Sequence, residues 1–430
     1  MLSSSIGRHH RLLKRCCFIT ALTVLLLLFS HETRAQTETL RLETWRVEDE
    51  ARWHQQILPI FHRTHPSIKI TTRASLATDY DSTLLLRLAA GTAGDLITCR
   101  PFDQSLALYN KGYLQDITAM PELRKFRSYG KIAWTTYYAD RVFCMPVAAV
   151  MTGFFFNTQI FKELNLTPPH TEEELFDALA IIKRSGKYLP LAFGTKEAWQ
   201  SSQILFAGMG PNHWHGEQGR INLLTGRAKF TDAAYVDAWR ALAKISAYLP
   251  ENHKNIGERE ARELFLNGQA AIYPAGSWEI PFLSASNRSA HFAVFAPPPK
   301  HSEHNCHVLS HLDLGIGINA KSTHPEQAAT FLAWLSGGSF AQTLSNSLPG
   351  FFPLSNHSVE INNPLAKEMM SWRQQCDTSI RINSQFLNQA WPSLEQELWR
   401  VSAQVMRQEI TPEEAAKHIA DGVDKWFKPI

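Results

Sequence analysis

The chain has 430 residues, a formal net charge of +3 and a hydrophobic share of 44%. A chain of this length exceeds one ordinary hydrophobic core, so two domains are expected. The small, dispersed charge favours neither a nucleic acid nor another polyanion as a partner. The composition is typical of a globular protein, with abundant Trp and Phe.

The N-terminus has the pattern of a targeting segment. Basic residues, among them Arg8 and Arg15, precede an apolar run at residues 18–29 that is too short to span a bilayer. We expect residues 1–35 to be a cleavable signal peptide, cut after Ala35, and the mature protein to be periplasmic. Cys16 and Cys17 precede the apolar run, so neither stands where a lipidated cysteine would.

The remaining cysteines are too widely spaced to indicate a disulfide framework. An exported chain permits disulfides, but in a protein of this size buried free thiols are the expected state. The residues concerned are Cys99, Cys144, Cys306 and Cys376.

The first part of the chain alternates strands with helices. Strands are predicted at residues 40–45, 68–71 and 96–98, and helices at 53–61 and 80–90. Trp45 ends the first strand, and Asp49 follows it. Asp103 lies in the loop after the third strand, at its carboxyl end.

The middle of the chain contains a long extended run and an exposed aromatic. Residues 144–157 form the apolar run, interrupted by Pro146 and Gly153, and such a run alone also fits an ordinary buried strand. Trp199 stands between polar residues just before an apolar helix. Its flanking Glu and Gln make full burial unfavourable, so a surface stacking role is expected ahead of a core role.

Residues 263–278 carry the strongest local pattern. An amphipathic helix ends at Asn267-Gly268, and a short apolar strand at 270–273 follows. Gly276-Ser277 breaks the strand and brings Trp278 and Glu279 to its carboxyl edge, where α/β proteins bind ligands. The alternative, in which Trp278 is core and Glu279 a solvated acid, fits these residues equally well.

This stretch also resembles a family. Phe-Leu-Asn-Gly-Gln-Ala-Ala-Ile at 265–272, followed by Gly-Ser-Trp, is similar to a block of the extracellular solute-binding proteins of ABC importers, and closest to the carbohydrate-binding group that includes maltose-binding protein. The segment from Leu314 to Leu335, with Gly-Ile-Gly-Ile-Asn and His-Pro-Glu-Gln-Ala-Ala, resembles another such block. The similarity runs in order through the whole mature chain.

The resemblance implies an α/β fold of the type II periplasmic binding proteins. Two discontinuous lobes, each a mixed sheet flanked by helices, would be joined by a hinge around an interlobe cleft. We expect crossovers near Pro146 and near Phe292. Lobe I is expected at residues 36–147 and 292–338, and lobe II at 148–291 and 339–430.

The same resemblance implies a non-enzymatic receptor that binds a sugar or small oligosaccharide and delivers it to a membrane permease. No cofactor, metal or nucleic acid is expected, and the protein is expected to be a monomer. Flat aromatics would stack on the sugar, and carboxylates would accept hydrogen bonds from its hydroxyls. The candidate ligand-binding residues are Trp45, Asp49, Asp103, Trp199, Trp278, Glu279, Asp313 and Trp391.

Several alternatives stay open. A glycerol-phosphate-type ligand would use Arg46 or Arg100. The histidine-rich tract between His301 and His311 leaves open the alternative of a metal-binding import receptor, although its spacing lacks the paired ligands of a closed zinc site. A sensory receptor without an importer, or a secreted carbohydrate-active enzyme whose carboxylates are paired only in space, is also compatible.

Overall fold

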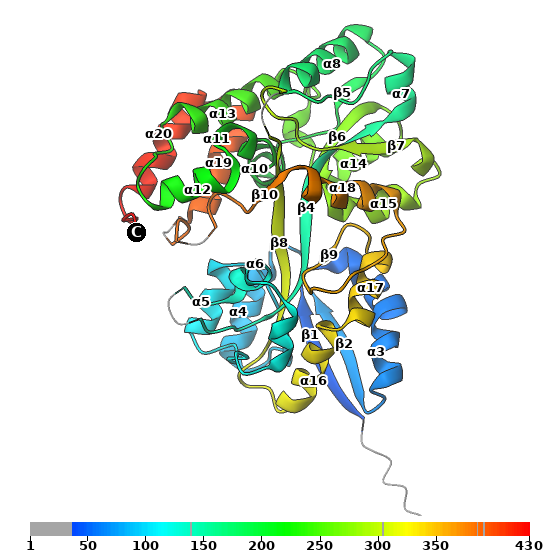
Figure 1. Ribbon diagram of the computed structural model, residues 1–430, viewed down its shortest axis with the longest axis vertical. Coiled ribbons are helices and arrows are strands. Elements are labelled where there is room, and N and C mark those ends of the chain that lie inside the picture. Colours follow the sequence, from blue (N-terminus) through cyan, green and yellow to red (C-terminus); the bar gives the residue numbers. More distant parts are fainter. Residues whose placement is uncertain (1–36, 138–139, 303–304, 385, 390–391) are drawn as a thin grey trace, which may run out of the picture.

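The computed structural model describes residues 37–137, 140–302, 305–384, 386–389 and 392–430 (Figure 1). The predicted signal peptide at 1–35 and the candidate Trp391 lie outside these residues. None of the described helices combines the length and the apolar character that crossing a bilayer requires.

The described strands form one continuous mixed sheet, as expected for two linked α/β lobes. Its main path runs β2-β1-β3-β8-β4-β6-β5, with β10 beside β8 and with β7 and β9 beside β4. β1 pairs in parallel with β2 and β3, whereas β8 is antiparallel to β3 and to β4. The strands are β1 (Glu38–Thr44), β2 (Ile68–Ala74), β3 (Leu96–Cys99), β4 (Met145–Asn157), β5 (Leu189–Leu191), β6 (Ala270–Gly276), β7 (Phe292–Phe295), β8 (His307–Ile318), β9 (Phe352–Pro353) and β10 (Asp377–Ser379).

Helices surround the sheet in two groups, one at each end of the molecule (Figure 1). Around β1 and β2 lie α3 (Leu58–Thr64), α4 (Tyr80–Ala90), α5 (Asp103–Asn110), α6 (Ser128–Lys131), α16 (Pro325–Leu335) and α17 (Gly338–Ser347). The other group comprises α7 (Thr158–Glu163), α8 (Glu172–Ser185), α11 (Pro211–Trp214), α12 (Gly216–Leu224), α13 (Ala233–Ser246), α14 (Glu258–Leu266), α15 (Ile280–Ala285), α18 (Pro364–Gln375), α19 (Leu394–Met406) and α20 (Pro412–Val423), with the short α9 (Ala198–Gln200) and α10 (Ala207–Met209).

Two long strands, β4 and β8, carry the chain between the lobes (Figure 1). The first half of β4 pairs with β8, and its second half pairs with β6 and β7. The expected outward crossover near Pro146 therefore lies in β4. The expected return crossover near Phe292 is wrong: β7 pairs with the second-lobe half of β4, prolines follow it, and the chain returns through β8.

The apolar side chains pack into a first-lobe cluster and two second-lobe clusters. Leu40, Phe61 and Phe331 belong to the first, whereas Phe193 and Phe265 belong to the others. The first cluster also contains Phe340 and Leu344 of α17, which the sequence-based division assigned to lobe II. They lie there because α17 follows α16 closely and packs its apolar face beside Trp53.

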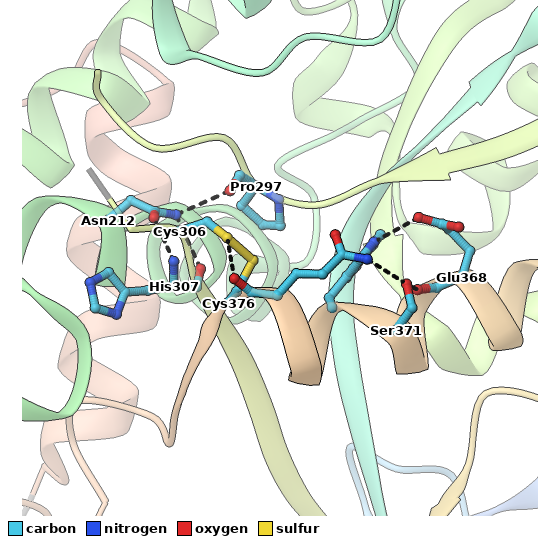
Figure 2. The surroundings of a disulfide bond; sticks show 9 residues. Asn212, Pro297, Cys306, His307, Glu368, Ser371 and Cys376 are labelled. Carbon is cyan, nitrogen blue, oxygen red and sulfur yellow. Dashed lines mark hydrogen bonds between the residues drawn. A yellow bond between two sulfur atoms is a disulfide. The ribbon is translucent and has the colours of Figure 1, made fainter. Parts of the chain in front are cut away.

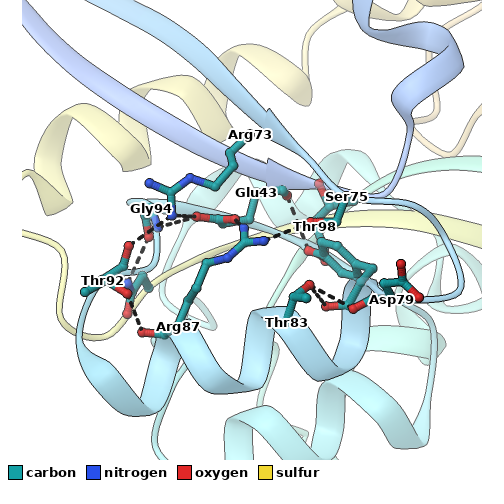
Figure 3. Close-up of polar contacts among 11 residues, drawn as sticks. Glu43, Arg73, Ser75, Asp79, Thr83, Arg87, Thr92, Gly94 and Thr98 are labelled. Carbon is teal, nitrogen blue, oxygen red and sulfur yellow. Dashed lines mark hydrogen bonds and ion pairs between the residues drawn. The ribbon is translucent and has the colours of Figure 1, made fainter.

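A buried carboxylate braces the strands of the first lobe where they approach the second. Glu43, at 0% exposure near the end of β1, lies within 3.3 Å of Arg73 and also pairs with Arg87 of α4. Its other contact is the backbone N–H of Gly94, which donates to Oε1 at 2.9 Å (Figure 3). These contacts supply the partners that a buried charge requires and hold β1, β2, α4 and the entry to β3 together.

The cysteines form two disulfides, which corrects the expectation of free thiols. Cys99 at the end of β3 is bonded to Cys144 just before β4, and Cys306 to Cys376. The second bond joins the segment entering β8 to the segment entering β10 (Figure 2). The pairing escaped sequence analysis because each partner is distant in the chain and adjacent only in the sheet.

Candidate functional site

The candidate residues gather where the two lobes meet. Loops after β1, β3 and β6 leave the sheet at the carboxyl ends of those strands, which is where α/β sheets present their ligand groups. The hinge strand β8 adds His311 and Asp313, and the segment after β10 adds Arg381. Both lobes and the hinge therefore contribute side chains to one region.

Trp199 and Trp278 form an aromatic pair on the second lobe. Their ring centroids are 6.2 Å apart with planes inclined by 46°, and both side chains are half-buried. Trp278 packs against the hydrophobic clusters of both lobes. Gly276 leaves room for the ring, since a Cβ there would lie 2.0 Å from it. The strand break predicted at Gly276-Ser277 thus places Trp278 at the lobe junction.

Trp45 is different, because its ring is covered. Trp45 is 6% exposed, and its ring centroid lies 5.3 Å from that of Tyr80 in an edge-to-face arrangement. The guanidinium of Arg100 lies 4.6 Å from the Trp45 ring centroid. Arg100 is held there by Asp81 at 3.0 Å. The expectation that Trp45 presents an open indole is therefore corrected: the group stacked on its face is a cation of this same lobe.

Asp313 is the carboxylate at the centre of the region. Burial raises the pKa of Asp313, and the charges of Arg46, Arg381 and Arg100 oppose that rise. His311, on the same strand, has Nε2 3.6 Å from Asp313 Oδ1. Burial lowers the pKa of His311 well below its usual value, with Arg381 and Arg100 acting in the same direction, so the imidazole is neutral at neutral pH.

The loop after β1 contributes an ion pair. Arg46 Nε lies 2.5 Å from Asp49 Oδ2, and the Arg46 guanidinium lies 4.7 Å from the Phe351 ring centroid. Asp49 is 1% exposed, and its second oxygen, Oδ1, is buried with no hydrogen-bond partner among the described residues. Asp49 Oδ1 therefore has no hydrogen-bond partner among the described residues, and a buried acceptor of this kind calls for a partner.

Asp103 links the first lobe to the second. It accepts a hydrogen bond from the Tyr137 hydroxyl, and the Tyr137 ring lies 4.4 Å from that of Phe386 in the second lobe. Burial raises the pKa of Asp103, and the charge of Glu395 adds to the rise. Asp103 is therefore engaged in a contact across the junction.

Arg381 lies in this region, and sequence reasoning missed it. Its guanidinium donates to Glu395 Oε1 at 2.8 Å and to Gln203 Oε1 at 2.7 Å, while Nε is buried with no partner among the residues the structure describes. No local signal marked it, because Arg381 follows a strand of three residues at the chain's far end. Only the pairing of β10 with β8 brings it near Asp313.

Glu279 was expected to accept hydrogen bonds from the ligand, but it lies in the interior. It is 0% exposed and receives two hydrogen bonds from Arg262, at 2.5 and 2.9 Å. Its neighbour Glu258 accepts the Trp278 indole N–H at 2.7 Å. Burial raises the pKa of Glu258 to about 8, and the charge of Glu279 contributes to that shift.

The histidine-rich tract divides between two places. His311 lies on the hinge, whereas His307 lines a separate polar hollow with His215, Glu217 and Asp377. Within the described ranges, no group of three or more His, Cys, Asp or Glu side chains is arranged to hold a metal ion.

Two α/β lobes joined by a pair of hinge strands, with polar and aromatic groups gathered between them, define a hinged two-lobe binding protein. The chain belongs to the bacterial extracellular solute-binding protein family, whose model matches residues 44–337. It is 22% identical over 397 residues to the multiple sugar-binding protein of Streptococcus mutans, covering 87% of each chain.

Solved structures share the fold. A protein from a study of xylan utilization by Caldanaerobius polysaccharolyticus superposes with a TM-score of 0.77 at 18% identity, covering 90% of this chain and 100% of that one. The solute-binding protein RafE in complex with raffinose gives a TM-score of 0.74 at 16% identity, covering 90% and 99%. At such identities the likeness establishes the fold.

Proposed function

We propose that this chain is the receptor of an ABC importer that binds a sugar or small oligosaccharide between its lobes and delivers it to a membrane permease. The observation that carries the proposal is the Trp199–Trp278 pair of the second lobe, whose Trp278 ring packs against hydrophobic clusters of both lobes. The names of the relatives, a multiple sugar-binding protein and a raffinose complex, support the same ligand class.

Sugars combine apolar C–H faces with many hydroxyls, so their binding sites need both flat rings and charged hydrogen-bond partners. Trp199 and Trp278 provide the rings. Asp313 and Asp49 Oδ1 provide acceptors, and Arg381 Nε provides a donor. Neutral His311 accepts or donates according to its tautomer, which suits a hydroxyl.

The charge balance favours a neutral sugar over a phosphorylated one. Arg46 pairs with Asp49, Arg100 with Asp81, and Arg381 with Glu395. An anionic ligand would have to compete with these carboxylates for each cation. The glycerol-phosphate alternative therefore receives less support than the neutral sugar.

The enzymatic alternative is also less well supported. Glu279, the acid next to Trp278 in the chain, is buried in a two-bond contact with Arg262 and cannot reach a glycosidic bond in that position. Glycoside hydrolysis needs two carboxyl groups on either side of the scissile bond.

A ligand that touches both lobes would stabilise the closed arrangement of the hinge by its differential affinity for that state. The bending would fall on β4 and β8, which connect the lobes. We further propose that the mature protein is a periplasmic monomer.

The test is calorimetric titration of purified mature protein with raffinose, stachyose, xylo-oligosaccharides and chito-oligosaccharides, alongside glycerol phosphate. Micromolar or tighter binding of at least one neutral sugar, with a smaller radius of gyration in solution scattering, is the expected result. Binding of glycerol phosphate alone, or release of shorter sugars during incubation, would replace this function with one of its alternatives.

A further inference from the structure

Glu258 has a role that the ligand-binding groups above do not explain. It is the first residue of α14, it is half-buried, and its Oε1 accepts the Trp278 indole N–H at 2.7 Å. Trp278 itself belongs to the 3-10 turn after β6, so this hydrogen bond ties that turn to the start of a helix. An indole has a single N–H, and this contact uses it.

The same glutamate also contacts the segment that carries the other indole, that of Trp199. The backbone N–H of Glu258 donates to Glu197 Oε2 at 3.3 Å, and Glu197 is the cap residue immediately before the helix that carries Trp199. Glu258 therefore touches both segments that hold the aromatic pair. Removing the carboxyl group would free the Trp278 ring to rotate away from the 46° inclination it has to Trp199.

We propose that Glu258 is a positioning residue that holds the Trp278 indole at its angle to Trp199. The consequence for sugar binding depends on the proposed function, whereas the positioning itself does not. Glu258 acts through Trp278 and is not assigned a contact with sugar.

The surroundings of Glu258 account for the raised pKa of its carboxyl group. Glu279 on the turn after β6 and Glu197 before α9 add negative charge, and Arg262 on α14 opposes them. Tyr273 on β6 faces the same group, and burial keeps its hydroxyl protonated, with a pKa well above the usual value. Burial, together with the negative charges of Glu279 and Glu197, raises the pKa of Glu258 to about 8, against the opposing effects of the Trp278 hydrogen bond and Arg262. Ionisation above that pH would place a second carboxylate charge next to Glu279.

The test observes the Trp278 indole without any ligand. Protein labelled with ¹⁵N at tryptophan is titrated from pH 6 to pH 9.5, with Trp278→Phe used to assign the resonance. In the wild type, the Trp278 Nε1–H signal should shift with a midpoint near the pKa of Glu258, about 8. Glu258→Gln keeps an acceptor and should remove the midpoint, whereas Glu258→Ala should speed exchange of the indole proton with water about fivefold or more.

Glu263→Gln is the matched control, since Glu263 is an exposed glutamate of the same helix. Circular dichroism establishes that each variant is folded, and Glu258→Gln serves if Glu258→Ala is not. An unchanged midpoint in Glu258→Gln, or an unchanged indole exchange rate in Glu258→Ala, would overturn the inference.

A second measurement separates this inference from the proposed function. Raffinose is titrated into each variant while tryptophan fluorescence is recorded. If the wild type binds raffinose, Glu258→Ala should weaken binding about fivefold, and Glu258→Gln should restore it. Equal raffinose affinity in Glu258→Ala would contradict the consequence for sugar binding, whereas the indole titration decides the positioning itself. If the wild type binds neither raffinose nor any other sugar named for the calorimetric test, the proposed function fails while the indole titration still decides the role of Glu258.

Discussion

The ring centroids of Trp199 and Trp278 lie 6.2 Å apart at the lobe junction, although the two residues come from different elements of the second lobe. If both rings stack on sugar, Trp199→Ala and Trp278→Ala should each weaken binding of the sugar identified by calorimetry by about 1–3 kcal/mol, or roughly fivefold or more. Trp426→Ala, a half-buried tryptophan near the C-terminus, is the control. Undiminished affinity in both site variants would exclude the pair as the platform.

Asp313 should make sugar binding sensitive to acid. Because burial raises its pKa, its carboxylate should be lost at a higher pH than an ordinary aspartate as the solution is acidified. Affinity should therefore fall toward acidic pH in the wild type. Asp313→Asn should bind about tenfold more weakly at neutral pH and lose this dependence. Asp421→Asn, an exposed aspartate of α20, should behave as wild type; a wild-type pH profile in Asp313→Asn would contradict the assignment.

Glu258 should make the protein less stable at alkaline pH. The folded state holds its proton up to pH of about 8, whereas an ordinary glutamate releases it near 4.5. The contribution of Glu258 to stability is therefore fully present below the pKa that its carboxyl group has in the unfolded chain. This contribution is lost as the pH rises toward the pKa that the group has in the folded protein. Glu258→Gln, which cannot ionise, should melt higher than wild type at pH 8.5 by roughly 4 °C, and by much less at pH 5. Thermal scans at both pH values measure the difference in melting temperature between Glu258→Gln and the wild type. A difference of equal size at both pH values would refute the prediction.

Glu43 should be essential for the stability of the first lobe. Removing it leaves Arg73 and Arg87 without their carboxylate and the Gly94 N–H without an acceptor (Figure 3). Glu43→Ala should lower the free energy of unfolding by about 3–5 kcal/mol in urea. Glu38→Ala at the half-buried start of β1, where the carboxylate pairs with His324 at 3.1 Å, should cost under ~1 kcal/mol, and a similar cost for Glu43→Ala would show that the network is dispensable.

The Cys99–Cys144 disulfide should stabilise the first lobe through its effect on the unfolded chain. It closes a loop with a sequence separation of 45, and loop-closure entropy for that length corresponds to about 4 kcal/mol. The double variant Cys99→Ala/Cys144→Ala should therefore unfold at a lower urea concentration. Thiol titration of the denatured wild type without reductant should detect none of these four cysteines; free thiols there would contradict both bonds.

Much of the secondary structure, together with the position of Trp278 after β6, was predicted from the sequence. The periodicity of residues 263–273 and the break at Gly276 are local properties, so they predicted β6, the end of α14 and the position of Trp278 correctly. The same reasoning located β1 and β3, and with them the segments that follow these strands, in which Asp49 ends a 3-10 helix and Asp103 begins α5. The exposure of a side chain depends on residues that are distant in the sequence. For this reason Trp45 and Glu279 were expected at the surface, whereas Arg100 covers the first and Arg262 the second in the structure.

The tertiary structure alone decided which distant residues meet. Arg381 reaches Asp313 because β10 pairs with β8, and Cys99 reaches Cys144 because β3 and β4 flank the same strand. The sequence predicted a hinged two-lobe receptor through its resemblance to this family, which runs in order along the mature chain, and the family model matches residues 44–337. Partners, burial and charge at the junction depend on contacts between elements far apart in the chain, and those exist only once the sheet is assembled.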